Sequence, residues 1–428
     1  MGPGAADDRG VTAEIADSLR LIEEGAFEEA IALCERLKDD PEQGADALHL
    51  LGIAAAHAGE AERALDLLGQ AVAADPSNWE RRLNLGSLAL DLGSVDIAVE
   101  ELGAVCAEFP QEPVPQSLLG NALSKVGRFE EAVAAQERAV ALRPDAAQLW
   151  GNLAGAYFMW EKIEAAEAGY AHAVKLDPTD ARMHFNLGGA RTTLGRLEEG
   201  LASFDEALRL RPDYADALTS RGVVLRALGR LDEGIAAMEQ AFSAEPDSDH
   251  VRFNLGVARL YAGDFAAGYA LYEARRERAP QSGREGFGVP WDGSPRPGET
   301  LVVEREQGLG DSLQFLRYLR HAKARVGRVV FRCQEVLVPF LKETFREDGI
   351  AIEPFQLEPY PGLYAPLVSL PHLLGLTEDP LVGEIELAVD PARIAAWAER
   401  LGPKTRGPRI GLVWQGNPGY PSDAIRSE

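Results

Sequence analysis

The sequence has few of the residues on which metal and disulfide chemistry depend. Its 428 residues include only three cysteines and seven histidines. Cys34, Cys106 and Cys333 lack the spacing of a metal-binding motif, and an odd number cannot form a complete disulfide framework. No two histidines are spaced as a ligand pair. We therefore expect reduced thiols and no metal site.

Basic residues and long apolar runs are also scarce. There are 43 Lys and Arg against 68 Asp and Glu, giving a net charge of −25. This balance repels phosphate backbones, and no helix carries a compensating basic stripe, which excludes nucleic acid as a partner. No apolar run approaches a membrane span, and residues 1–10 lack the order of a signal peptide. We expect a cytoplasmic protein whose Gly-rich, acidic residues 1–10 form a disordered tail.

What the sequence has instead is a period of 34 residues. Small residues and prolines recur at this spacing from residue 45 onward. The prolines are Pro76, Pro110, Pro144, Pro178, Pro212, Pro246 and Pro280. A fixed period of this length is typical of a helical solenoid. We expect eight repeats over residues 11–282.

Each repeat is expected to fold as two helices. In the fourth repeat, Gln116–Leu123 and Phe129–Leu142 have apolar residues at helical spacing, and Gly127 separates them. Small residues such as Gly120 and Ala132 let the paired helices approach closely. This pattern resembles tetratricopeptide repeats over roughly two thirds of the chain. The resemblance implies an α-solenoid, wound as a superhelix, whose first helices line a concave groove for a protein or extended peptide.

The sixth position of the repeat bears on how such a groove binds its partner. Four of the eight repeats have asparagine there: Asn84, Asn152, Asn186 and Asn254. Each amide has a donor and an acceptor, so a column of them can bind an extended backbone. The column resembles the asparagine ladder of O-linked N-acetylglucosamine transferase. Alternatively, the amides bond to neighbouring turns or face water. The groove positions lack the Lys/Asn/Arg clamp that captures C-terminal carboxylates.

The composition changes after the repeats. Residues 283–299 are rich in glycine and proline, and we expect a linker there. Beyond it, strand-like and helix-like segments alternate, which predicts a Rossmann-like parallel sheet over residues 300–428. Strands are expected at Thr300–Arg305, Arg328–Cys333, Ile350–Phe355 and Arg409–Trp414, and helices at Ser312–Ala324, Leu337–Phe345 and Pro391–Leu401.

The turn after the first expected strand is the candidate catalytic site. It contains Gly308, Gly310 and Asp311. Ligands of open α/β sheets bind at the carboxyl ends of strands, and the two glycines allow a ligand to approach the backbone. Asp311 lies at the expected start of the next helix. Its alternative role is that of a helix cap.

Three segments here resemble a bacterial family that joins tetratricopeptide repeats to a GT-B glycosyltransferase domain related to ADP-heptose lipopolysaccharide heptosyltransferases. They are Glu306–Tyr318, Pro366–Pro371 and Gly411–Pro418. The resemblance implies that Asp311 is a metal-independent general base for an acceptor hydroxyl. It also assigns Gln415 and Asn417, with Gly308 and Gly310, to ligand-binding loops.

The chain departs from this family in two ways. It ends at Glu428, shortly after what would be the first strand of the second GT-B lobe, which supplies most of a nucleotide-sugar pocket. It also lacks the histidine that often follows Gly-Asn-Pro, since Tyr420, Ser422 and Asp423 precede Arg426. We therefore expect no self-sufficient catalysis unless a partner chain or a missing lobe completes the donor site.

Two functional hypotheses follow from these patterns. In the first, the solenoid holds a bacterial protein client and Asp311 faces a Ser or Thr hydroxyl for O-glycosylation from a nucleotide sugar, without another cofactor. In the second, the chain is a non-catalytic interaction scaffold whose α/β domain caps the solenoid. An open cleft around Asp311 would favour the first hypothesis, and burial of Asp311 in capping bonds the second. A lipopolysaccharide heptosyltransferase is disfavoured, because a sugar acceptor has little use for eight repeats.

Overall fold

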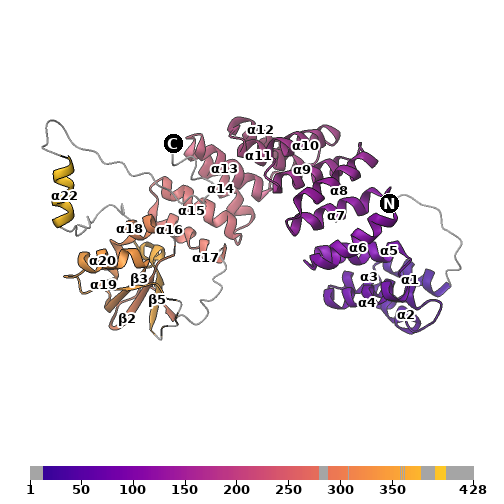
Figure 1. The fold of residues 1–428 in the computed structure, drawn as a ribbon, viewed down its shortest axis with the longest axis horizontal. Coiled ribbons are helices and arrows are strands. Elements are labelled where there is room, and N and C mark those ends of the chain that lie inside the picture. The colour runs from indigo at the N-terminus through magenta and orange to yellow at the C-terminus, as the bar shows by residue number, and fades with distance from the viewer. Residues whose placement is uncertain are drawn as a thin grey trace. The chain divides into compact units, whose positions relative to one another are not determined.

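The chain consists of a helical unit followed by a unit with a parallel sheet. The computed structural model describes residues 13–278, 288–306, 308–356, 358, 360, 362–376 and 391–401, so the expected tail at residues 1–10 lies outside them. The two compact units are Met1–Ala258 and Arg259–Glu428. Figure 1 labels the elements of both units. No helix within the described ranges is both long enough and apolar enough to cross a membrane.

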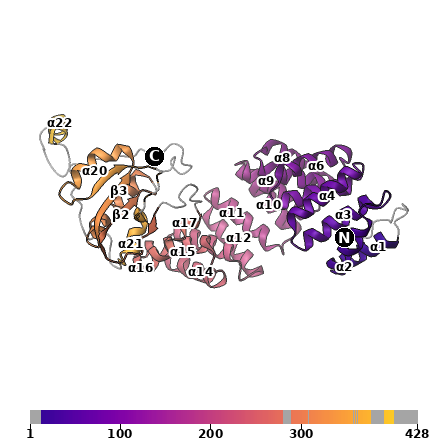
Figure 2. The ribbon, with the colours of Figure 1, turned by 90° about the horizontal axis from the view of Figure 1, so that it is seen from below.

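Helices alternate in pairs through the repeats, which confirms the predicted helical solenoid. Figure 2 shows the successive pairs of the first unit from a second direction. The first helices of the pairs are α1 (Ala13–Glu23), α3 (Gly44–His57), α5 (Trp79–Asp91), α7 (Pro113–Lys125), α9 (Ala147–Met159), α11 (Ala181–Thr193), α13 (Ala215–Ala227) and α15 (Asp249–Tyr261). The second helices are α2 (Phe27–Leu37), α4 (Ala61–Ala74), α6 (Val95–Glu108), α8 (Phe129–Leu142), α10 (Ile163–Leu176), α12 (Leu197–Leu210), α14 (Leu231–Ala244) and α16 (Phe265–Tyr272).

The turn inside each pair needs a residue in the left-handed backbone region. Seven repeats have glycine there, with φ between 76° and 82°. They are Gly25, Gly59, Gly93, Gly127, Gly195, Gly229 and Gly263. The fifth repeat has Glu161 instead, with φ of 59°. A side chain is disfavoured in this region, so Glu161 is a strained position within an otherwise regular array.

Close contact between paired helices explains the second series of glycines. A Cβ atom added to Gly52 or Gly188 would lie 2.6 Å from Leu68 or 2.7 Å from the ring of Phe204, respectively. Small residues of the second helices, such as Ala64 of α4 and Ala98 of α6, are completely buried. Large and small side chains therefore interlock between the two helices of a repeat, as dense packing requires.

The second unit contains a five-stranded parallel sheet. In the order in which the strands pair, it consists of β1 (Val289–Pro290), β5 (Leu363–Pro366), β2 (Arg296–Glu304), β3 (Val326–Cys333) and β4 (Ala351–Pro354). The chain leaves β2 toward β3 and returns to the other side of β2 with β5. The order of the strands therefore reverses between β2 and β5, which is the position where open α/β sheets bind ligands.

One face of this sheet packs against short helices in a single apolar core. Leu301 and Phe331 of the sheet share this core with Leu316 and Leu341 of the helices, and Tyr269 of α16 belongs to it too. The short helical elements of this unit are α17 (Arg275–Arg278), α18 (Leu309–Phe315), α19 (Tyr318–Lys323), η1 (Glu335–Leu337), α20 (Val338–Thr344), η2 (Leu367–Ser369) and α21 (Leu370–Leu373). A further helix, α22 (Pro391–Leu401), agrees with the expected one.

The structure differs from the expected element boundaries in three places. Part of the expected linker forms strand, because β1 lies within it and β2 begins at Arg296. The helix expected at Ser312–Ala324 is divided at Leu316–Arg317 into α18 and α19. The strand β5 was not expected, since its four residues are too short to show a period. The strand expected at Arg409–Trp414 lies outside the described residues.

Candidate functional site

A groove of about 550 Å³ crosses the first helices of the third to sixth repeats. Its lining residues come from α5, α7, α9 and α11, with one residue from the second helix α10. First helices of successive repeats lie parallel, about 8–10 Å apart where they are in contact. Four of them therefore span about 25 Å, which an extended segment of roughly eight residues matches in length.

The floor of the groove includes two glycines of α9. Gly151 and Gly155 are one helical turn apart and both line the groove. The sixth repeat also has glycine at the position of Gly155, whereas the second and seventh have Ile53 and Val223. A Cβ atom on Gly155 would lie 3.5 Å from the Tyr170 hydroxyl of α10. The missing side chain therefore leaves Tyr170 at the floor of the groove.

Tyr170 is a buried residue with a hydroxyl group that has spare hydrogen-bonding capacity. The side chain is 6% exposed and lines the groove. No hydrogen bond joins its hydroxyl to another of the described residues. Burial raises the pKa of Tyr170 to about 12, against a smaller lowering by the charge of Arg182. The hydroxyl is therefore protonated at neutral pH and can donate to a ligand.

A buried glutamine fixes the amide beside this floor. Gln136 of α8 is completely buried at a position where the second and third repeats have Leu68 and Leu102. Its Nε2 donates to Asn121 Oδ1 at 2.8 Å and to the Ser117 carbonyl at 2.9 Å, and Ser117 Oγ donates to Gln136 Oε1 at 3.1 Å. Because Oδ1 of Asn121 accepts from Gln136, its Nδ2 is left as a donor on the groove wall.

Three members of the expected asparagine column already have hydrogen bonds within the chain. Asn84 Nδ2 lies 2.7 Å from His49 Nε2, and Asn152 Nδ2 donates to Ser117 Oγ at 2.9 Å. Asn254 Nδ2 donates to the carbonyl of His250 in its own helix at 2.9 Å. These contacts correspond to the alternative role of the column, in which the amides bond to neighbouring groups.

The fourth member differs from the other three. Asn186 lines the groove, is half-buried, and has no hydrogen-bond partner within the described part of the chain. Asn152 has a second bond, because Gln148 Nε2 donates to its Oδ1 at 2.7 Å, and Arg182 Nη2 donates to Gln148 Oε1 at 2.5 Å. Of the two expected column residues that line this groove, Asn186 is therefore the one without a partner in the described chain.

The rim of the groove is partly apolar and partly charged. Phe158 and Met159, at the end of α9, are 37% and 52% exposed, which is high for large apolar side chains. Lys125 Nζ donates to the carbonyl of Leu90 at 3.0 Å, and Asp91 lines the same wall. The groove thus combines an apolar contact surface with hydrogen-bond donors.

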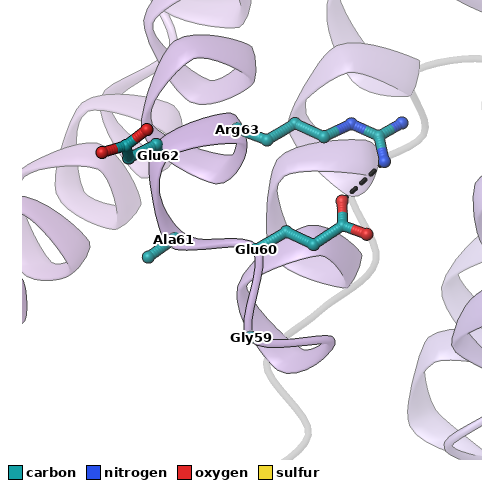
Figure 3. Close-up of a pocket in the computed structure, with 5 residues that line it drawn as sticks. All are labelled: Gly59, Glu60, Ala61, Glu62 and Arg63. Carbon is teal, nitrogen blue, oxygen red and sulfur yellow. Dashed lines mark hydrogen bonds and ion pairs between the residues drawn. The ribbon is translucent and has the colours of Figure 1, made fainter.

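A second hollow, at the turn between α3 and α4, has a simpler explanation. Figure 3 shows Arg63 and Glu60 facing one another across it, with Glu62 pointing away. Arg63 Nη1 lies 2.6 Å from Glu60 Oε2, and Arg63 Nη2 lies 3.0 Å from Glu35 Oε1. The cation of this hollow, Arg63, is thus already paired with carboxylates of the chain.

The turn expected to be catalytic follows β2 in the second unit. Asp311 is half-buried in the first turn of α18, and its Oδ2 accepts a hydrogen bond from the Gly308 amide at 3.1 Å. Its Oδ1 has no hydrogen-bond partner among the described residues. A Cβ atom on Gly310 would have nothing within 4 Å. One carboxylate oxygen therefore caps the helix, and the backbone beside it is open.

A buried ion network lies next to this turn, where the strand order reverses. Arg275 is 8% exposed, and its guanidinium lies 2.6 Å from Glu273 and 2.7 Å from Glu306. It also donates to Ser369 Oγ at 2.8 Å. Burial lowers the pKa of Arg275, but Glu306 and Glu273 raise it, so the net effect is upward. Glu306 and Ser369 belong to the two sequence segments noted for their family resemblance, and here they bind Arg275.

The remaining expected site residues cannot be placed. Gln415 and Asn417 lie outside the described residues. Within the described ranges, no group of three or more His, Cys, Asp or Glu side chains could hold a metal ion. Burial raises the pKa of both Cys106 and Cys333 to about 11.

Several residues of the groove were not expected from the sequence. Asn121, Tyr170 and Gln136 lie at positions that are usually read as structural. The sequence carries a signal for one of them, because Gln136 interrupts an apolar series in which the second and third repeats have Leu68 and Leu102. The sequence does not single out Tyr170 as a binding residue, because other repeats also have a large side chain at this position.

Comparison with known proteins agrees with this repeat architecture. Two sequence models of the tetratricopeptide repeat match the chain, one at residues 55–122 and the other at residues 117–181, 160–215 and 219–283. Protein FlbA of Caulobacter vibrioides is 30% identical over 169 residues, which are 34% of this chain and 26% of that protein. The chain thus spans about a quarter of that relative's length.

Solved structures with a similar fold include two bacterial tetratricopeptide-repeat proteins. One, from Parabacteroides merdae, has 15% identity and a TM-score of 0.49 over 57% of this chain and 97% of its own. The other, from Thermus thermophilus, has 24% identity and a TM-score of 0.38 over 43% of this chain and 100% of its own. The sequence models cover more than half of the chain at the repeats seen in the structure. The chain belongs to the tetratricopeptide-repeat proteins.

Proposed function

We propose that this protein is a scaffold that binds an extended polypeptide segment of a partner protein in the groove of the third to sixth repeats. The observation that carries the proposal is the free hydrogen-bonding capacity of Tyr170 and Asn186 in a groove with exposed Phe158 and Met159. Extended peptides bind through their backbone polar groups and through pockets for single side chains. The groove offers both kinds of contact.

A selection experiment tests this function. Random 12-residue peptides displayed on phage would be selected against the full chain, and the best peptide synthesised. Deuterium exchange of the full chain would then be compared with and without that peptide. We expect slower exchange in α7, α9 and α11. Selection of no peptide, or protection confined to the outer helices α8, α10 and α12, would contradict the proposal.

For the second unit we propose a role as the acceptor-side lobe of a protein glycosyltransferase that modifies the bound client. This proposal is supported by the Gly308–Asp311 turn at the carboxyl end of β2, next to the reversal of strand order. The Oδ1 atom of Asp311 has no described partner and could accept a proton from a hydroxyl group. The competing role is a cap on the repeats, which the hydrogen bond between Asp311 and Gly308 favours.

Calorimetric titration separates these two roles. Uridine, guanosine and adenosine diphosphate sugars would be titrated into the full chain and into the Asp311→Ala variant. A donor-binding lobe predicts saturable binding of one of them, and transfer to a Ser- or Thr-containing peptide that is lost in the variant. No heat at millimolar concentrations would favour the cap.

A further inference from the structure

The region of the groove around Tyr170 favours a particular kind of ligand group. The groups with spare capacity that face this region are Asn121 Nδ2, the Tyr170 hydroxyl, the Asn186 amide and the Lys125 ammonium. Asn121 and Lys125 can only donate there, since Oδ1 of Asn121 is occupied by Gln136. The one carboxylate of the lining, Asp91, is an exposed residue. The region is therefore rich in donors within a chain that is strongly acidic.

Two further features shape this region. Gly155 has no side chain to cover the Tyr170 hydroxyl, which lies 3.5 Å from the position that a Cβ atom would take, so the hydroxyl can be reached from the groove. Phe158 lies on the same helix as Gly155, about one turn farther on, with Met159 beside it. A bound segment with one side chain in the opening could therefore place a neighbouring side chain against Phe158 and Met159.

We propose that the opening takes the carboxylate of an Asp or Glu side chain from the bound segment, while a large apolar residue of the same segment packs on Phe158 and Met159. A carboxylate only accepts hydrogen bonds, so it matches the donors Tyr170, Asn121 and Lys125. Hydrogen bonds to a charged acceptor are also stronger than those to a neutral one. This inference rests on the proposed function of the groove.

Capped synthetic peptides provide the test. An array of acetylated, amidated nine-residue peptides would carry Glu, Gln or Lys at the centre, with varied flanking residues including Phe or Leu. The tightest peptides would be measured by fluorescence anisotropy against the full chain. We expect Glu to bind about tenfold more tightly than Gln, with an affinity that falls as salt is added. Equal affinity of the Glu and Gln peptides would overturn the proposal.

Substitutions in the groove test whether the preference for Glu over Gln arises at the opening beside Tyr170. Tyr170→Phe removes a hydroxyl that has no partner in the described chain, so it should fold normally and reduce the Glu preference to less than threefold. Gly155→Val gives the fifth repeat the residue that the seventh repeat has at the equivalent position, Val223. This variant should bind the peptide at least tenfold more weakly. The matched control is Gly103→Ala, a helical glycine whose added Cβ has nothing within 4 Å and which does not line the groove. It should change binding less than twofold.

The outcomes separate this inference from the proposed function. If peptides protect α7, α9 and α11 from exchange but bind equally well to the Gly155→Val and Tyr170→Phe variants, the groove binds peptides and the carboxylate opening is wrong. If no peptide protects these helices, both proposals are wrong.

Discussion

At the scale of single residues, the fifth repeat differs from the other described repeats in the turn between its two helices. It has Glu161 there, where the others have glycine. Glu161 adopts a backbone conformation that Gly195 adopts in the next repeat. Replacing Glu161 by glycine removes the steric cost of the side chain, which is of the order of 1 kcal/mol.

We therefore predict that Glu161→Gly increases the free energy of unfolding by about 1 kcal/mol, measured by urea denaturation. The control is Glu130→Gly in the exposed first turn of α8, which should lower it by about 1 kcal/mol, because glycine is a poor helix former and the change removes a negative charge near the helix N-terminus. A loss of stability in both variants would mean that Glu161 is not strained.

A half-buried histidine, His49, gives the repeats a specific pH dependence. Burial lowers the pKa of His49 to about 4 from its ordinary 6.5, with a further lowering by Arg81 and an opposing effect of Asp46. The neutral ring can accept the hydrogen bond of Asn84 Nδ2 at 2.7 Å. Above pH 6.5 the ring is neutral in both the folded and the unfolded chain, so this contribution to stability is fully present. As the pH falls from 6.5 toward 4, the unfolded chain binds the proton first, and the contribution is lost.

We predict that His49→Gln makes the free energy of unfolding less dependent on pH in this window. The difference between the wild type and the variant should change by roughly 2–3 kcal/mol between pH 7 and pH 4. Denaturation at several pH values measures it, with the exposed His321→Gln as a control that should leave the slope unchanged. Parallel curves for wild type and His49→Gln would exclude this role for His49.

At the scale of helices, contacts between the two members of a pair decide which glycines are replaceable. Gly188 and Gly189 are neighbours on α11, but they face different surroundings. A Cβ atom on Gly188 would lie 2.7 Å from the ring of Phe204, whereas one on Gly189 would have nothing within 4 Å. Phe204 is only 2% exposed, so its ring has little room to move.

We predict that Gly188→Ala lowers the free energy of unfolding by about 1–3 kcal/mol through overpacking. Gly189→Ala should leave it unchanged or raise it by up to about 1 kcal/mol, because alanine favours the helix. Thermal and urea denaturation of the two variants provide the comparison. Equal effects would show that the paired helices adjust to an added methyl group.

The sequence predicts elements well where a residue pattern repeats. The period places α8 at Phe129–Leu142, as the structure has it. The sequence does not predict β5, because four residues are too few to show an alternation of apolar and polar side chains. The groove was predictable in part: the asparagine column is visible in the sequence. Which amides are free is not, because His49 and Ser117, which bind two of them, lie 35 residues away.

At the scale of the whole molecule, the chain has two units with separate cores. The second unit contains the buried guanidinium of Arg275, which binds the half-buried Glu273 and Glu306. Removing one partner of a buried ion network leaves charges without compensation and costs several kcal/mol. Exposed ion pairs contribute much less.

We predict that Arg275→Ala destabilises the second unit by about 3–5 kcal/mol and leaves the first unit unchanged. Deuterium exchange should become faster in β2 and β5, while α7 to α10 keep their protection. Arg346→Ala, which removes an exposed pair with Glu343, is the control and should have almost no effect. Faster exchange in both units would contradict their independence.

The central claim is that the groove of the third to sixth repeats binds an extended polypeptide. The most direct measurement is a photo-crosslink from a selected peptide that carries benzophenone in place of its large apolar residue. After irradiation with the full chain, mass spectrometry identifies the attached residues. Our account predicts attachment to Phe158, Met159 or their neighbours on α9. Attachment to α8 or α12, or to the second unit, would contradict it.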